Sequence, residues 1–543
     1  MPAKRILMYE EARKKIAEGA RRFSRSIAAT YGPKGGNVVI ERSWGAPRVT
    51  RDGYTVAREV EFEDAEENLG ARILRDAVER THEEAGDGTT TACVIAEALL
   101  EGGLTLAAAG YDPMGVARGV RLAADAISRQ LDKISKPVRS TRNVAYVATV
   151  ACAGDERLGE LVAQAQKKAG EDGIIVVEEG KSIETTLETI EGLQFDRGYL
   201  SPYFVTDRER MEAVLEDVNI LMFEKRLSSI DDFLPLLEKI SEAGKPLLVI
   251  SEDVEGAVLA TLVVNNLQGT LRCCAVKAPG YGEKRKRNLE DIAAVTGGRA
   301  IIEETGIKLQ DVGMWDLGHA RKVVIGREET TIVGGAGDEA TIKARMEQIR
   351  EEIAATDSDY DREQLEKRLA RLAGGVVEIS VGGATEVEVK YRKMLLEGAI
   401  SAVRAALVDG VVPGGGVALL RAAERTKKIK TDGESEEQGA RLMLRVAEAP
   451  LRRLLSNAGV DPTAYVEKIR DGKGGYGFNL RTMALGDLSK AGVIDPTFVV
   501  KTALRNAVSA ASMLLTTDVS VTELPESKAE SETMPNLDDL PDY

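Results

Sequence analysis

Hydrophobic residues recur every three to four positions over several long stretches of the chain, with charged residues between them. In the stretch 9–30, Ala12, Ile16, Phe23 and Ile27 fall on one face, and lysines and arginines fall on the other. This spacing is typical of an amphipathic helix whose apolar face packs on a core. The same periodicity predicts helices over 66–83, 113–134 and 389–408.

The pattern changes after residue 173, where short runs of β-branched and aliphatic residues alternate with helical stretches. Such runs predict buried strands, and their alternation with helices predicts an α/β insert with its own core. A helical hairpin is predicted over 338–373, with a turn at 356–359. The predicted strands cover 174–177, 247–250 and 275–276, with a helix over 230–243, and an earlier short strand covers 37–40.

Composition narrows the class of protein. Of the 543 residues, 43% are hydrophobic and 30% are charged, which is typical of a globular protein. The net charge of −15 argues against nucleic acid as the main partner. The sequence shows no apolar run of about 18 residues and no N-terminal signal pattern, so we expect a cytoplasmic protein without a membrane span. Its four cysteines lack zinc spacing, and its two histidines leave little scope for histidine-based catalysis.

The strongest candidate for chemistry is the heptapeptide 85–91, Ala-Gly-Asp-Gly-Thr-Thr-Thr, which precedes a stretch rich in helix formers. Gly86 and Gly88 let the backbone approach a ligand closely, and the helix N-terminus that follows favours an anion. A bare phosphate would repel Asp87, so we expect Mg²⁺ between the carboxylate and the phosphate. These features predict a nucleotide phosphate site. The alternative is an ordinary N-cap, since Asp and Thr cap helices routinely.

Other glycine-rich turns could complete such a site. The segment 31–36, Tyr-Gly-Pro-Lys-Gly-Gly, ends the first helix, and the segment 411–417 supplies a second glycine-rich backbone. Turns at 474–479 and 494–496 add polar side chains. The stretch 525–543 is acidic and contains proline, which is typical of disorder.

Several of these motifs occur together, in the same order and spacing, in one family. They are Gly-Pro-Lys-Gly-Gly-Asn at 32–37, Arg-Asp-Gly at 51–53, the loop 86–91, the segment 196–204 and Pro-Gly-Gly-Gly at 413–416. From about residue 4 to 523 the chain resembles the group I chaperonins of the GroEL type. The resemblance implies a multidomain α and α/β fold. It has a mainly helical equatorial ATP-binding domain (1–136 and 410–523), a small α/β intermediate hinge domain (137–190 and 377–409), an α/β apical domain that binds clients and co-chaperonin (191–376) and a disordered acidic tail (524–543).

The resemblance also implies an activity. The protein would be an ATP-hydrolysing molecular chaperone of the cytoplasm, a protein-folding isomerase, with ATP and Mg²⁺ as cofactors and K⁺ as an additional candidate. It would be a homo-oligomer of heptameric rings, stacked in pairs. The rings would enclose unfolded client proteins under a GroES-type co-chaperonin, without nucleic acid or membrane as a partner.

The family's functional positions map onto this sequence residue by residue. The nucleotide-binding positions correspond to Thr30, Tyr31, Gly32, Pro33, Arg51, Asp87, Gly88, Thr89, Thr90, Thr91, Gly415, Asn479 and Asp495, with Asp87 as the Mg²⁺ ligand and Asp52 as a catalytic acid near the γ-phosphate. The client- and co-chaperonin-binding positions correspond to Tyr199, Ser201, Tyr203, Phe204, Leu234, Leu237, Leu259, Val263 and Val264. The resemblance places these nine residues in one exposed apolar patch. Without it, 259–264 is simply a helix or strand with a core face.

The sequence departs from the family at three places. The family's catalytic aspartate of the intermediate domain aligns with Gly398, which has no side chain to activate water. The neighbouring Glu397 would point about a hundred degrees away on a helix. Arg51 replaces a lysine, which keeps the charge and changes the hydrogen-bond geometry. An acidic tail also replaces the flexible Gly-Met repeat, so we expect a specialised paralogue that binds ATP and hydrolyses it slowly.

Two other hypotheses stay open at this point. One is a client-dedicated holdase or assembly chaperone that binds ATP but hardly turns it over. The other is a conventional phosphotransferase that uses the 86–91 loop. The phosphotransferase is less favoured, because the sequence shows no P-loop lysine–serine pair and no kinase motif set.

Overall fold

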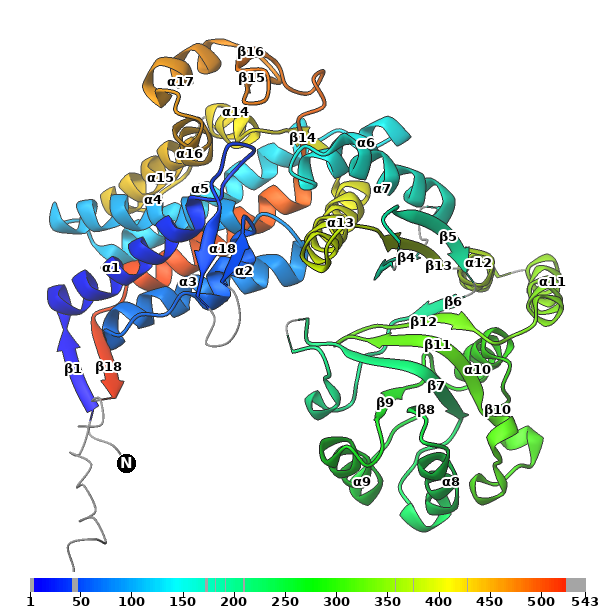
Figure 1. The fold of residues 1–543 in the computed structure, drawn as a ribbon. Helices are drawn as coiled ribbons and strands as arrows, with labels where there is room; N and C mark the ends of the chain where they lie inside the picture. Colours follow the sequence, from blue (N-terminus) through cyan, green and yellow to red (C-terminus); the bar gives the residue numbers. More distant parts are fainter. Residues whose placement is uncertain are drawn as a thin grey trace, which may run out of the picture. The chain divides into compact units, whose positions relative to one another are not determined.

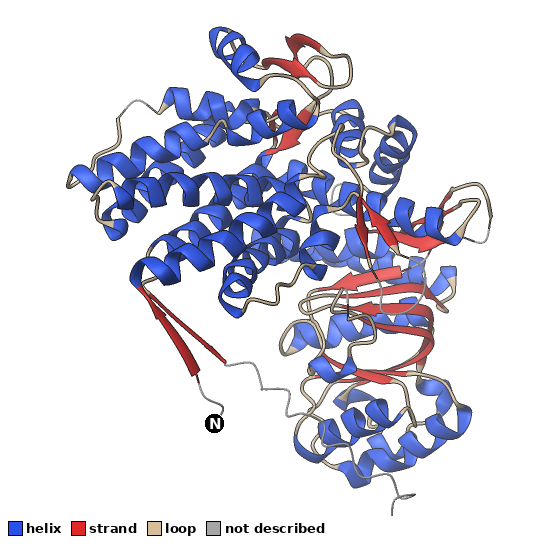
Figure 2. Cartoon of the chain, turned by 60° about the vertical axis from the view of Figure 1, so that its left-hand side comes forward, coloured by secondary structure: helices blue, strands red, loops and turns tan. Residues whose placement is uncertain are grey.

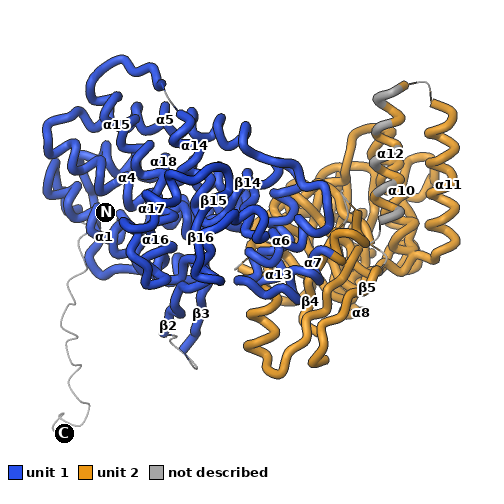
Figure 3. Tube along the Cα trace, turned by 90° about the horizontal axis from the view of Figure 1, so that it is seen from above, with its two compact units in different colours: residues 1–163, 395–543 blue, residues 164–394 orange. Residues whose placement is uncertain are grey.

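The computed structural model describes residues 4–41, 47–170, 174–180, 182–190, 192–208, 210–356, 358–374, 376–426 and 428–523. The chain divides into two compact units, residues 1–163 with 395–543 and residues 164–394 (Figure 3). The second unit is therefore an insertion between the two parts of the first. The predicted tail 524–543 and Asp357 of the predicted hairpin turn lie outside the described residues.

The first unit is mostly helical (Figures 1 and 2). Its helices are α1 (Tyr9–Ala28), α2 (Gly53–Glu59), α3 (Ala65–Ala85), α4 (Thr89–Ala108), α5 (Pro113–Ile134), α6 (Thr141–Ala151), α14 (Val417–Arg425), α15 (Glu434–Val446), α16 (Ala449–Asn457), α17 (Pro462–Asp471) and α18 (Thr497–Leu515). Helices α7 (Glu156–Ala169) and α13 (Glu386–Asp409) each have residues in both units. The fold class predicted from the resemblance, with its mainly helical part and its α/β part, is confirmed.

The described residues of the first unit also form four two-stranded antiparallel sheets. They pair β1 (Lys4–Met8) with β18 (Val519–Glu523), β2 (Val38–Ile40) with β3 (Arg48–Thr50), β14 (Val411–Pro413) with β17 (Ile494–Pro496) and β15 (Tyr476–Asn479) with β16 (Ala484–Asp487). The β14–β17 pair joins two segments that are far apart in the sequence. β17 contains the predicted nucleotide-binding residue Asp495, and the predicted residue Gly415 follows β14 by two positions.

The main core of the first unit contains side chains from α1, α3, α4, α5, α15 and α18. Phe23, Ile27, Leu74, Ile95 and Ile127 are almost fully buried in it. A second, smaller core joins α14, α16 and α17 to the β15–β16 hairpin. It matters for the site because Tyr31 packs against it.

Helices α4 and α18 are long and apolar enough to cross a membrane by length and composition alone. Their most apolar windows are 50% and 72% buried within the protein. Both helices contribute to the main core of the first unit, and burial of this kind is the ordinary reason for an apolar helix in a globular fold.

The second unit is built on a seven-stranded mixed sheet. Its strand order is β6 (Gly192–Phe195), β12 (Thr330–Gly335), β11 (Gly318–Ile325), β7 (Ala213–Phe223), β8 (Leu247–Ser251) and β9 (Cys273–Lys277), and β10 (Ala300–Ile301) also pairs with β7. The crossovers contain α8 (Ile230–Ala243), α9 (Gly256–Gln268) and α10 (Glu283–Thr296). A three-stranded sheet orders β4 (Ile174–Glu179), β13 (Val376–Val381) and β5 (Thr186–Ile190). The predicted helical hairpin forms as α11 (Glu339–Ala355) and α12 (Asp359–Gly374).

Candidate functional site

The loop 86–91 connects α3 to α4, and its two glycines adopt conformations that other residues avoid. Gly86 ends α3 with a φ of 67°, and Gly88 caps α4 with a φ of 87°. A Cβ atom on Gly86 would overlap Ser401 of α13, and one on Gly88 would lie 2.8 Å from Val499 Cγ1. Backbone conformation and packing therefore both require glycine, and the N-terminus of α4 is left open to an anion.

Two carboxylates near this loop have raised pKa values. Surrounding protein atoms raise the pKa of Asp87, with the negative charge of Asp52 as a smaller cause, although the Asp87 side chain is still open to solvent. Desolvation, with a contribution from Asp87, raises the pKa of Asp495 to about 7. Within the described part of the chain, no lysine, arginine or histidine forms an ion pair with Asp52, Asp87 or Asp495.

This carboxylate cluster fits a bound cation. Hard oxygen ligands are the donors that Mg²⁺ prefers, and Mg²⁺ is usually held by one or two carboxylates together with water and substrate phosphates. The described residues contain no group of three or more His, Cys, Asp or Glu side chains that could hold a metal by themselves. The carboxylates present are therefore the kind of donor set that fits a cation shared with a phosphate.

Threonine side chains of α4 tie the loop to two other segments. The Tyr31 hydroxyl and Thr91 Oγ1 form a hydrogen bond of 2.8 Å. A Cβ atom on Gly53 would overlap Thr90 Oγ1, so the N-terminus of α2 lies against the first turn of α4. Asp52 caps α2, because its Oδ2 accepts hydrogen bonds from the Thr55 N–H and hydroxyl at 2.7 and 2.6 Å. The predicted catalytic acid thus also has a structural role.

The turn after α1 is close-packed. The buried Thr30 donates its hydroxyl to the Ile27 carbonyl at 2.8 Å, so the Thr30 carbonyl is the group it can still offer a ligand. Gly32 has a φ of 79°, and a Cβ there would overlap Leu454. Arg51 Nη2 donates to the Pro33 carbonyl at 3.3 Å, so the arginine that replaces the family's lysine contacts this turn.

The second glycine-rich segment lies against Asp495. Val412 of β14 pairs with Asp495 of β17, and a Cβ on Gly414 would lie 2.8 Å from Asp495 Oδ1. Gly415 and Gly416 follow with φ values of 66° and 76°, and Gly416 caps α14. Direct contacts or close electrostatic coupling thus link five parts of the candidate site, which are the segments 30–33, 51–53, 87–91 and 414–415 and residue Asp495.

Asn479 ends β15, on the small core that also packs Tyr31. Its Oδ1 accepts hydrogen bonds from the Arg481 N–H at 2.9 Å and the Thr482 N–H at 3.3 Å. The amide oxygen is therefore engaged in the hairpin turn, and the amide nitrogen is the group left for a ligand.

Gly398 lies on α13, one helical turn before Ser401, which packs on Gly86. Residues three apart share a helix face, so position 398 is on the face that contains the contact with the loop. A Cβ at Gly398 would meet no atom within 4 Å. The position where the family has an aspartate is therefore open, and nothing in the described packing requires glycine there. Ser401 itself gave no sequence signal, since it is one polar residue in an alanine-rich helix.

The nine predicted client-binding residues lie in the second unit, but they do not share one exposed surface. Tyr203, Leu234 and Val264 are 64%, 44% and 48% exposed. Tyr199, Leu259 and Val263 are half-buried, whereas Ser201, Phe204 and Leu237 are buried. The expectation of exposure is therefore wrong for the last three, because their side chains belong to or border the core under α8 and α9.

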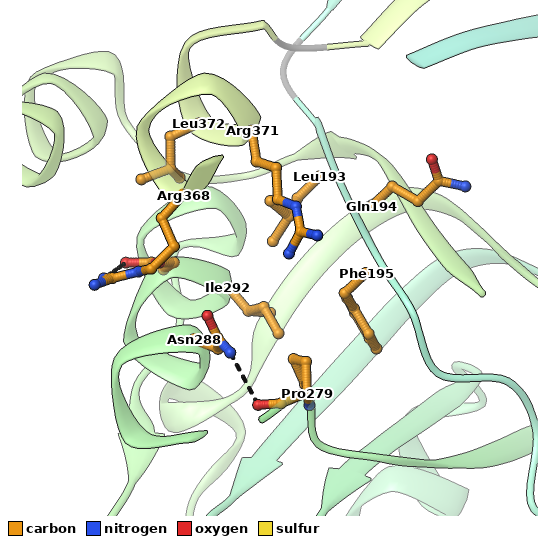
Figure 4. Close-up of a pocket in the computed structure, with 10 residues that line it drawn as sticks. Leu193, Gln194, Phe195, Pro279, Asn288, Ile292, Arg368, Arg371 and Leu372 are labelled. Carbon is orange, nitrogen blue, oxygen red and sulfur yellow. Dashed lines mark hydrogen bonds and ion pairs between the residues drawn. The ribbon is translucent and has the colours of Figure 1, made fainter. Parts of the chain in front are cut away.

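A separate cavity in the second unit lies between β6, α10 and α12 (Figure 4). Arg368 and Arg371 of α12 border it, and Asn288 Nδ2 donates to the Pro279 carbonyl at 3.0 Å. Its volume of about 20 Å³ is enough for a single water molecule. It is too small for a nucleotide, and none of the predicted nucleotide residues lines it.

Two comparisons with known proteins bear on this arrangement. The model of the TCP-1/cpn60 chaperonin family matches residues 23–523. The fold is also similar to a crystal structure of the chaperonin gp146 from bacteriophage EL 2 (Pseudomonas aeruginosa), determined in the presence of ATP-BeFx. That match has a TM-score of 0.68 and 22% sequence identity, and it covers 95% of this chain and 98% of the phage chain.

Proposed function

This chain belongs to the TCP-1/cpn60 chaperonin family, whose members are chaperones, and on that premise we propose that it is an ATP-dependent chaperone that binds and encloses non-native proteins. The observation that carries the proposal is the convergence of the 87–91 loop, Tyr31, Gly415 and Asp495 around unpaired carboxylates and an open helix N-terminus.

In this proposal, different residues of the chain bind different parts of a nucleoside triphosphate. The N–H groups of Gly88 and of the first turn of α4 donate to the phosphate oxygens, with the hydroxyls of Thr89 to Thr91 as further donors. Asp87 holds Mg²⁺, which when bound would neutralise phosphate charge. Asp495 and Asn479 approach from β17 and β15, and Arg51 lies at the turn that carries Pro33.

Hydrolysis is slow in this proposal because position 398 carries no acid. Asp52 is then the remaining acid near the γ-phosphate, and one of its oxygens already caps α2. A missing general base costs about 10² to 10⁴-fold in rate. ATP binding depends on other residues and is retained.

The assembly is proposed from the family alone. Subunits form heptameric rings, stacked in pairs, in the cytoplasm, and a GroES-type co-chaperonin closes them. The exposed Tyr203, Leu234 and Val264 offer apolar surface to clients, and burial of such surface stabilises a complex by roughly 25 cal/mol per Å². Ring number is tested by electron-microscopy class averages of the purified protein.

The second candidate function is a holdase that binds ATP and clients and turns over very little. Gly398 is the observation that favours it. Calorimetric titration with MgATP tests the shared premise, and absence of binding would refute both functions. Refolding yield of a denatured client, measured beside phosphate release, separates them, because a holdase keeps the client bound without raising the yield.

A further inference from the structure

Arg421 is a buried arginine in the middle of α14, only 6% exposed. Its guanidinium makes five hydrogen bonds. Nη1 donates to Glu424 Oε2 at 2.9 Å and to the Arg470 carbonyl at 3.0 Å, and Nη2 donates to the Ile469 carbonyl. Nε and Nη2 also donate to the carbonyls of Gly474 and Tyr476, both at 3.4 Å. Four of the five acceptors are main-chain carbonyls.

These carbonyls belong to two consecutive pieces of chain. Ile469 and Arg470 are in the last turn of α17, where carbonyls lack partners within the helix. Gly474 and Tyr476 lie beyond the helix, in the loop and at the start of β15. A helix cap would explain only the first pair. The second pair fixes the strand that ends at Asn479.

The same strand also packs on the start of α14. A Cβ atom on Gly477 would lie 2.6 Å from Val417 Cγ2, and Val417 directly follows the cap residue Gly416. Gly415 and Asn479 are each two residues away from this contact between α14 and β15. Arg421 links these two elements by polar contacts to the backbone.

We propose that Arg421 is a positioning residue for nucleotide binding, which holds Asn479 and Gly415 in one fixed arrangement through the backbone of β15. The inference rests on the proposed ATP-binding function. Arg421 does not touch the nucleotide in this arrangement. A lysine in its place carries its three donor hydrogens on one nitrogen and lacks the three separated nitrogens with which Arg421 reaches carbonyls of both α17 and β15, so the end of β15 loses its fixed position.

The test is a double-mutant cycle on the full-length protein, with MgATP affinity measured by calorimetric titration. R421K and N479A are each expected to weaken binding about tenfold, and the double variant no more than the weaker-binding single variant, because both changes remove the same contact. R470K is the matched control. Arg470 lies at the end of α17, and its guanidinium pairs with carboxylates, those of Glu448 and Glu467 and, at 3.6 Å, that of Glu424, which Arg421 also contacts. A lysine at position 470 keeps the positive charge beside these carboxylates, so the MgATP affinity of R470K should stay that of the wild type.

Unchanged affinity in R421K, or losses that multiply in the double variant, would show that Arg421 only stabilises the fold. A thermal scan accompanies each titration. If R421K fails to fold, R421Q, which removes the buried charge, takes its place in the same cycle. A wild-type protein that does not bind MgATP refutes the proposed function itself, which is a different outcome from binding without coupling.

Discussion

The phenolic oxygen of Tyr31 and the hydroxyl oxygen of Thr91 lie 2.8 Å apart and form a hydrogen bond between the turn after α1 and the first turn of α4. Tyr31 also packs on the small core that carries the β15–β16 hairpin. This one side chain therefore connects three segments of the candidate nucleotide site.

Removal of that hydroxyl should weaken nucleotide binding while the packing is kept. We expect Y31F to lower MgATP affinity by up to about tenfold, since a net hydrogen bond contributes about 0.5–1.5 kcal/mol. Calorimetric titration measures the change. Y465F is the control, because its ring belongs to the same core and its hydroxyl has no hydrogen bond in the described part of the chain. Equal affinities for all three proteins would contradict the role given to Tyr31.

The empty position at Gly398 makes a gain of function testable. We expect G398D to raise the rate of phosphate release by about 10² to 10⁴-fold, because it supplies a carboxylate on the helix face that packs on Gly86. The new side chain meets no atom near its Cβ, and leaving glycine does not weaken the helix, so a change in folding would not explain the result. G398N has the same shape and no base, and it should remain slow. If G398D is no faster than wild type, the missing acid is not the cause of slow turnover.

Local patterns predicted most of the elements around this site. The helix predicted over 113–134 is α5, with the same ends, and the predicted strand 247–250 lies within β8. Asp112 caps α5 and Pro113 follows it, which explains why that boundary was visible in the sequence. Helices α6 and α7 were not predicted, although the buried residues Leu158, Val162, Ala165 and Ala169 give α7 an apolar period that the sequence contains.

The contacts between segments far apart in the chain could not be predicted from the sequence. Asp495 and Gly414 are brought together by the β14–β17 pairing, and nothing near either residue specifies the other. The solvent exposure of individual side chains could not be predicted from the sequence either. Phe204 and Tyr203 are neighbours in one turn, yet Phe204 is buried and Tyr203 is open, since only the position of α9 decides which ring is covered.

The raised pKa of Asp495, about 7, has a consequence for the protein without nucleotide. The carboxyl holds its proton more tightly in the folded state than in the unfolded state, where its ordinary pKa is about 3.9. Its contribution to stability is therefore complete below about pH 4 and is lost as the pH rises towards 7. We expect the thermal midpoint of wild type to fall relative to D495N between pH 4.5 and 7.5. Parallel curves for the two proteins would refute the assignment. Saturating MgATP should reduce the difference, because a bound cation favours the charged carboxylate.

A buried charge cluster in the second unit should control stability without affecting nucleotide binding. Asp291 accepts hydrogen bonds from Arg345 Nε at 2.7 Å and from Arg368 Nε and Nη2 at 2.9 Å, and its side chain is 6% exposed. D291A leaves both guanidinium groups without this partner, so we expect a loss of about 3–5 kcal/mol. Urea unfolding followed by circular dichroism measures it. E347A removes only the exposed pair with Arg350 and should cost under about 1 kcal/mol. A loss of MgATP affinity in folded D291A would show that the cluster has a wider role.

Two adjacent aromatic residues, Tyr203 and Phe204, allow client binding to be tested separately from folding. Tyr203 is 64% exposed, whereas Phe204 is fully buried in the core of the second unit. If the exposed apolar residues capture clients, Y203S should reduce the amount of denatured protein held in a light-scattering aggregation assay, at unchanged thermal midpoint. F204A should instead lower the free energy of unfolding by about 3–5 kcal/mol, because it leaves a cavity in the core. L234S gives a second exposed position on α8 and should act like Y203S. Full client capture by the double variant Y203S/L234S would rule out these two positions as client contacts, whatever F204A does to stability.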